Sequence, residues 1–153
     1  MGFGDLRALL TWHADCVVLG TMSIQSEQLK ARAMQFALDV LRLVDTFPPT
    51  TAGDVVGRQL AKCATSVAAN YRGTCNARSR AEFIAKLGVV VEESDESEFW
   101  LGVSVRKGLS DARETERLRI EAGEFRAIFG KSLGTARANV RLATASKGSQ
   151  MTR

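Results

Sequence analysis

Apolar side chains recur at alternating spacings of three and four residues along four segments of this chain, which is the pattern of amphipathic helices. The four stripes are Leu29, Ala33, Phe36, Val40 and Leu43; Val56, Leu60, Cys63, Val67 and Asn70; Phe83, Leu87, Val90, Ser94, Ser97 and Leu101; and Leu118, Ala122, Phe125 and Phe129. The 153 residues contain only two prolines, and these are adjacent. Four long helices with short connections predict an all-α fold, an up-down-up-down four-helix bundle.

Start signals set the expected boundaries of the first two helices. Ser26 is a suitable cap for a helix over about 27–46, and the proline pair then ends that helix. Thr51 is a suitable cap for a second helix, which we expect to run to about Cys75.

The third helix has the clearest signals. Ser79 and Glu82 have the spacing of a capping box, and Gly108 is a suitable left-handed terminator. The fourth helix is predicted to begin at Ser110 or Asp111.

A chain of this length fits one domain. Residues 22–137 are predicted to form the bundle, because the helical pattern begins at Met22 and weakens after Leu133. Residues 1–21 are interpreted as an N-terminal extension, with a docking segment as the alternative, and residues 138–153 as a basic, flexible tail. Charged residues interrupt the first segment too early for a membrane span. Three widely spaced cysteines suggest neither a disulfide framework nor a zinc site, which favours a cytoplasmic location.

Charge is distributed unevenly along the chain, although the net charge is only +4. Residues 53–91 hold six basic and two acidic side chains, whereas residues 92–98 hold five acidic and no basic ones. From Lys131 onward there are five basic side chains and no acidic one. The sequence therefore predicts strong local fields of both signs.

The basic residues between positions 53 and 91 are candidate contacts for nucleic-acid phosphates. They are Arg58, Lys62, Arg72, Arg78, Arg80 and Lys86. Tyr71 lies among them and is a candidate for stacking on a base. The alternatives are a solvated surface, or ion pairs with the acidic run of a neighbouring subunit.

Glu92 and Glu96 are four residues apart and share a helix face, which invites comparison with di-iron bundles. Such sites also need histidines on the helices, and the chain has one histidine, His13, in the N-terminal extension. No nucleophile and base converge in the pattern either. The sequence thus predicts no metal, no cofactor and no enzymatic activity.

Three further residues fall on or near the predicted apolar faces. Asn70 is expected to satisfy buried polar groups, and Asp95 to form a buried ion pair with Arg72 or Arg78. Apolar side chains point in several directions around Trp100, which predicts a subunit interface there. The alternative for Trp100 is that it covers the end of the bundle.

Several separate blocks of the sequence resemble a family of bacterial four-helix bundle proteins. The blocks are Gln59-Leu60, Ser66 to Arg72, Ala77 to Leu87, Glu92 to Glu96 and Trp100-Leu101. In order and spacing they are similar to the proteins linked to intervening sequences of 23S rRNA, a family that includes the accessory variability determinants of diversity-generating retroelements. The resemblance covers residues 28–137.

This resemblance implies a small cytosolic bundle that assembles as a ring-shaped homopentamer. It also implies that nucleic acid binds to a basic surface, together with a reverse transcriptase where the protein belongs to a retroelement. Two functions are therefore predicted. The first is a non-enzymatic accessory factor that binds RNA or DNA, and the alternative is a homo-oligomeric scaffold in which the arginines pair with Glu92, Glu93 and Glu96 of a neighbour.

Overall fold

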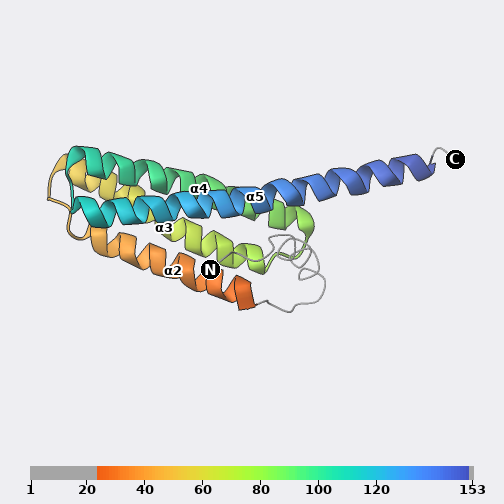
Figure 1. The fold of residues 1–153 in the computed structure, drawn as a ribbon, viewed down its shortest axis with the longest axis horizontal. Helices are drawn as coiled ribbons and strands as arrows, with labels where there is room; N and C mark the ends of the chain where they lie inside the picture. Colours follow the sequence, from red (N-terminus) through yellow and green to blue (C-terminus); the bar gives the residue numbers. More distant parts are fainter. Residues whose placement is uncertain (1–23, 152–153) are drawn as a thin grey trace.

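The computed structural model describes residues 24–151 of the protein, with side chains described from residue 24 to residue 142. Four helices make up this region: α2 (Ile24–Val44), α3 (Thr51–Cys75), α4 (Arg80–Lys107) and α5 (Ala112–Met151). They run alternately up and down side by side, and α5 projects beyond the others at the end where α3 turns into α4 (Figure 1). The predicted all-α class with four helices is confirmed for residues 24–151, while the pentameric ring stays a prediction.

Two of the predicted caps are wrong. Helix α3 is capped by Thr50 and not by Thr51, because Thr50 has an extended backbone and its hydroxyl accepts a hydrogen bond from the backbone N–H of Gly53 at 3.1 Å. Helix α2 already begins at Ile24, so Ser26 lies inside its first turn and is buried.

Both ends of α4 follow the prediction. The hydroxyl of Ser79 accepts from the backbone N–H of Glu82 at 3.1 Å. At the other end Gly108 has φ 67°, a left-handed conformation, and its N–H donates to the carbonyls of Ser104 and Val105. The cap and the terminator therefore fix the length of α4 from its own sequence.

Helix α5 is longer than the sequence suggested. Of the two predicted caps, Asp111 is the one whose carboxylate accepts from the N–H of Glu114, at 2.8 Å. The helix continues through residues 138–151, since this stretch contains alanine but no proline to stop it. That residues 138–153 are flexible stays a prediction, and residues 1–21 lie outside the described part of the chain.

Aromatic rings fill the centre of the core. The Phe125 ring stacks on Phe129 with centroids 5.6 Å apart and meets Phe36 of α2 edge-on at 5.4 Å. Tyr71 of α3 lies 4.8 Å from Phe129. One cluster of α5 rings thus holds α2 and α3 against α5.

Helix α4 buries serines where the other helices bury larger side chains. Ser94, Ser97 and Ser104 are fully buried, and each hydroxyl donates to the carbonyl four residues earlier in α4. Their polar groups are thereby satisfied inside the helix. The small side chains also let neighbouring helices approach α4 closely.

Ion pairs close the seam between α2 and α5. The Arg32 guanidinium donates to Glu121 at 2.6 Å and also to Glu124, and it lies 5.1 Å from the centre of the Phe125 ring. About two helical turns further along α2, Asp39 pairs with Arg117 of α5 at 3.1 Å.

Between residues 24 and 151, none of the helices has an apolar stretch long enough to cross a bilayer.

Candidate nucleic-acid interface

The six basic residues predicted to contact phosphates lie along α3 and around its turn into α4. Arg58 and Lys62 are exposed, one helical turn apart, in the first half of α3. Arg72 is exposed in the last turn of α3, and Arg78 and Arg80 are exposed at the α3–α4 turn. The structure therefore brings four of the six together at one end of the bundle, namely Arg72, Arg78, Arg80 and Lys86.

Carboxylates neutralise some of these residues. Arg58 pairs with Asp54 at 2.6 Å within α3. Glu82 pairs with both Arg78 and Lys86 at 3.5 Å. The backbone N–H of Arg78 is the main cause that lowers the pKa of Glu82, so this carboxylate is charged at neutral pH.

The remaining three, Lys62, Arg72 and Arg80, form no ion pair with any residue in the range 24–142. The Lys86 amine lies against the last turns of α3, since a Cβ added at Gly73 would be only 3.2 Å from its Nζ. The surplus of positive charge is thus greatest around the α3–α4 turn.

Tyr71 does not take part in this surface, contrary to the prediction. It is 2% exposed, and its ring packs on Phe129 in the core. Burial raises the pKa of its hydroxyl. Tyr71 therefore stabilises the bundle and is not available to stack on a base.

Asp95 is another correction. Its side chain is 70% exposed and lies 3.4 Å from Arg126 of α5, so it forms no buried pair with Arg72 or Arg78. Asp95 directly follows the buried Ser94, and adjacent residues of a helix point in different directions. Asp95 therefore faces α5 and not the core, which is why the predicted buried pair is wrong. Glu98 lies on the same side and pairs with Arg119 at 3.4 Å and with Arg126 at 3.0 Å.

The other acidic residues of α4 divide into two kinds. Glu92 and Glu96 are exposed and form no ion pair within residues 24–142. Glu93 is half-buried, and its Oε2 is covered without a hydrogen-bond partner in the described residues. No grouping of metal-ligating side chains occurs in the described region, and His13 lies outside it.

Asn70 and Trp100 occupy half-buried positions. The Asn70 amide donates to the carbonyl and the hydroxyl of Ser66, at 3.0 and 2.9 Å, so it satisfies groups of its own helix. Trp100 packs against the core and meets Phe99 edge-on at 5.0 Å. Phe99 is 60% exposed, and a subunit interface around Trp100 stays a prediction.

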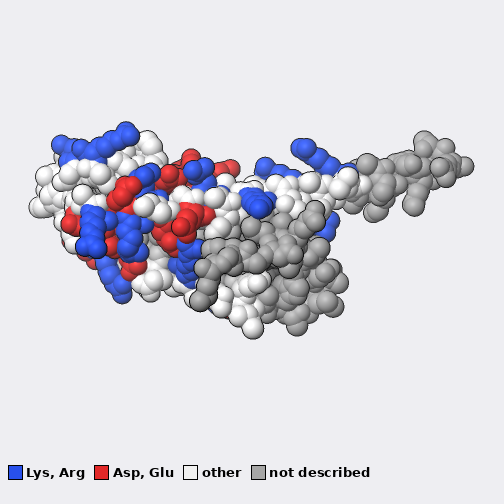
Figure 2. All heavy atoms as spheres, in the orientation of Figure 1, with Lys and Arg blue, Asp and Glu red and all other residues white. Residues whose placement is uncertain are grey.

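Sequence reasoning missed the contribution of α5 to the basic end. Lys131, Arg137 and Arg141 are exposed and form no ion pair inside the described region. On the face shown in Figure 2, basic and acidic side chains mix over the body of the bundle, but only basic ones appear along α5 toward its projecting end. The acid-free sequence after Glu124 was the available signal, but Lys131 and Arg137 were assigned only to the bundle, and Arg141 to the flexible tail over residues 138–153.

Fold and surface together define a class: an antiparallel four-helix bundle with a cationic end and a mixed-charge body. Within that class, the chain belongs to the family described as 23S rRNA-intervening sequence protein, whose sequence profile matches residues 26–131. The predicted resemblance is thereby confirmed.

A solved structure has the same fold. It is a protein of unknown function from the S23 ribosomal protein family of Bacteroides thetaiotaomicron, with a TM-score of 0.66 and 24% identity. The match covers 72% of this chain and 99% of that one. No curated protein matches the chain.

Proposed function

We propose that this protein is a non-enzymatic, oligomeric accessory factor that binds nucleic acid, with structured RNA as the ligand. One observation carries the proposal: Arg72, Arg78 and Arg80 are exposed around a single turn. Glu82 is the one carboxylate between residues 24 and 142 that pairs with any of the three. Such a surplus of guanidinium groups attracts phosphates, and arginine binds them in a bidentate manner.

The family supports RNA as the ligand, since its description refers to 23S rRNA. The exposed apolar side chains Phe99 and Ile120 support an assembly of several copies, because they would otherwise remain in water. We propose the ring-shaped homopentamer implied by the family resemblance as that assembly.

The test compares the wild type with the double variant Arg78→Glu plus Arg80→Glu. The affinity of each for a structured RNA is measured by fluorescence anisotropy at several salt concentrations. We expect the wild type to lose affinity steeply with salt, and the variant to bind roughly tenfold more weakly or worse, since two phosphate contacts become repulsive. The matched control is Arg106→Glu plus Arg113→Glu, which reverses two exposed charges at the opposite end of the bundle. Equal losses in the two variants, both folded by circular dichroism, would refute the proposed surface.

A specific observation also favours the scaffold as a second candidate. Glu92 and Glu96 are exposed without an ion pair in residues 24–142, and so they are free to meet arginines of a neighbouring copy. In that case, charge reversal at either patch dissociates the oligomer in light scattering, and RNA has no effect on its mass. Dissociation by Glu92→Lys plus Glu96→Lys, without RNA binding by the wild type, would select this candidate.

A further inference from the structure

The ion pairs between α4 and α5 fix how the two helices are aligned. Glu98 of α4 meets Arg119 and Arg126 of α5, and Asp95 meets Arg126. Both helices rise by the same amount per residue and run in opposite directions. Any residue before Glu98 in α4 therefore lies level with a residue correspondingly later in α5.

Because Glu98 meets both Arg119 and Arg126, this alignment brings Arg80 level with the stretch of α5 that begins at Arg137 and includes Arg141. Arg80 precedes Glu98 by 18 residues and Arg137 follows Arg119 by 18 residues, which is about five helical turns in each helix. Whole turns preserve the side of the helix, so Arg80 lies on the α5 side of α4, as Glu98 does. Arg137 likewise lies on the α4 side of α5, about three turns beyond Arg126.

The end of the seam thus has an arginine of α4 level with arginines of α5, where the middle has Glu98 between Arg119 and Arg126. Arg141 follows Arg137 by one turn and adds a third guanidinium. In the described region no carboxylate pairs with Arg80, Arg137 or Arg141. Glu82, the carboxylate nearest in sequence to Arg80, is held on the α3 side by Arg78 and Lys86.

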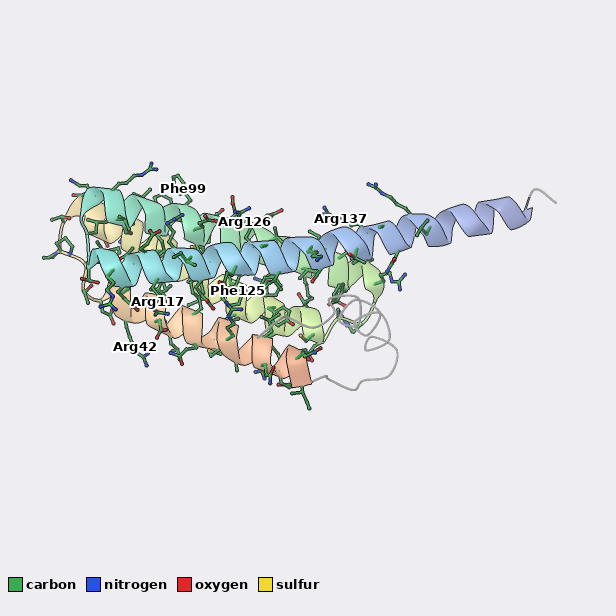
Figure 3. The ribbon with its side chains drawn as sticks, viewed as in Figure 1. Arg42, Phe99, Arg117, Phe125, Arg126 and Arg137 are labelled. Carbon is green, nitrogen blue, oxygen red and sulfur yellow. The ribbon has the colours of Figure 1, made fainter. Side chains whose placement is uncertain are left out.

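Figure 3 places Arg137 where α5 passes the end of the other helices, with Arg126 further back along the same helix. Like charges that face each other without a counter-ion repel, so such an arrangement favours a bound anion. Guanidinium groups on two sides match an anion with several oxygens, above all a phosphate.

We propose that Arg80, Arg137 and Arg141 form a phosphate-binding cleft between the start of α4 and the second half of α5, in which a nucleic-acid backbone binds. This rests on the proposed function and extends it, since α5 becomes the second wall of a surface that the sequence placed on α3 and its turn alone. The backbone then crosses the end of the bundle rather than following the side of α3.

The juxtaposition is tested without any ligand by a double-mutant cycle with Arg80→Glu, Arg137→Glu and the double variant. Each single variant replaces a repulsive pair by an attractive one, and we expect each to raise the melting temperature slightly. The double variant restores like charges, so its melting temperature should fall below the sum of the single effects. Additive effects would show that the two side chains do not face each other and would overturn the cleft.

The ligand is tested with two probes, a duplex RNA of about 20 base pairs and inorganic tripolyphosphate. Arg137→Glu plus Arg141→Glu should weaken RNA binding at least about fivefold and reduce the salt slope by about one per lost contact, whereas Arg113→Glu should change neither. The same double variant should lose the rise in melting temperature that tripolyphosphate gives the wild type.

The outcomes separate this cleft from the proposed function. RNA binding that depends on Arg78 but equally little on Arg137, Arg141 and Arg113 leaves the function standing and removes the cleft. A wild type that ignores RNA but is stabilised by tripolyphosphate through Arg137 and Arg141 keeps a phosphate site there, but removes the proposed function and the nucleic-acid backbone as the occupant of that site. A wild type that responds to neither probe overturns both.

Discussion

The middle and the end of the α4–α5 seam are built from the same kind of side chain but differ in what surrounds it. In the middle, Arg119 and Arg126 lie within ion-pair distance of Glu98, at 3.4 and 3.0 Å. At the end, Arg80, Arg137 and Arg141 have no carboxylate partner in the described residues. Both regions contain arginines, but only the arginines at the end of the seam are without an ion pair to a described residue.

The comparison teaches that the count of basic residues is a poor guide to a binding surface. Arginines within reach of carboxylates have part of their hydrogen-bonding capacity occupied within the protein. Arginines beyond that reach remain available for an anion. Position relative to the acidic residues of α4, rather than arginine content, therefore separates structural from binding cations.

The largest expected effect comes from the core beneath the paired middle. Phe125→Ala removes the ring that contacts both Phe36 and Phe129, and we expect a loss of about 3–5 kcal/mol in the free energy of unfolding. Urea denaturation measures this loss. RNA affinity of the molecules that remain folded should be unchanged, and a selective loss of affinity would mean that the core and the cationic end are not separate regions.

A smaller effect is expected when the carboxylates in the middle of the seam are removed, so that its arginines lose their partners like those at the end. Asp95→Asn plus Glu98→Gln removes the partners of Arg126 and one partner of Arg119. We expect a loss of stability of no more than about 1 kcal/mol, because these ion pairs are partly exposed. RNA affinity should rise, since the freed guanidinium groups can contact phosphates.

The matched control for that variant is Glu92→Gln plus Glu96→Gln. It removes the same amount of charge from α4, but from residues without an ion pair in the described region. If RNA affinity rises equally in both variants, net charge alone explains it. A larger rise for the first variant would sharpen the distinction between paired and unpaired arginines.

The smallest effect concerns acid pH and the Asp39 carboxylate in the paired body. Burial of Asp39 tends to raise its pKa, but hydrogen bonds from Gln35 and Arg117 outweigh this, and the pKa lies below its ordinary value of 3.8. A lowered folded-state pKa gives stability that is present above pH about 4 and is lost as the pH falls through the folded value. Asp39→Asn should therefore lower stability at pH 6, by less than about 1 kcal/mol, and by less than that at pH 2.

Urea titrations of the wild type and Asp39→Asn at the two pH values check this. A difference that persists unchanged at pH 2 would contradict the assignment to the Asp39 carboxylate.

Much of the fold follows from local sequence signals. The spacing of Leu118, Ala122, Phe125 and Phe129 places each of them in the core, and Gly108 ends α4 because only a left-handed residue can turn the chain there. The cap at Thr50 was missed by one position, because Thr50 and Thr51 are chemically equivalent and the choice depends on backbone conformation.

The candidate site was less predictable, because side chains far apart in sequence form it. Arg72, Arg78 and Arg80 are neighbours along the chain and were found. Arg137 belongs to the same end only because α5 remains helical and runs back along α4. Asp95 was assigned to the wrong arginine for the same reason, since its partner Arg126 is 31 residues away in the sequence.

The serines buried along α4 have a mechanical consequence. Each hydroxyl donates to a carbonyl of its own helix, and only Ser97 also contacts a polar group of another helix in the described region, the Cys63 thiol of α3. The position of α4 along its axis is then held by apolar packing together with ion pairs at the surface, such as the pair of Glu98 with Arg126. Concentrated salt screens such ion pairs while leaving apolar contacts intact, and because each pair contributes no more than about 1 kcal/mol, salt should weaken the alignment of α4 only slightly.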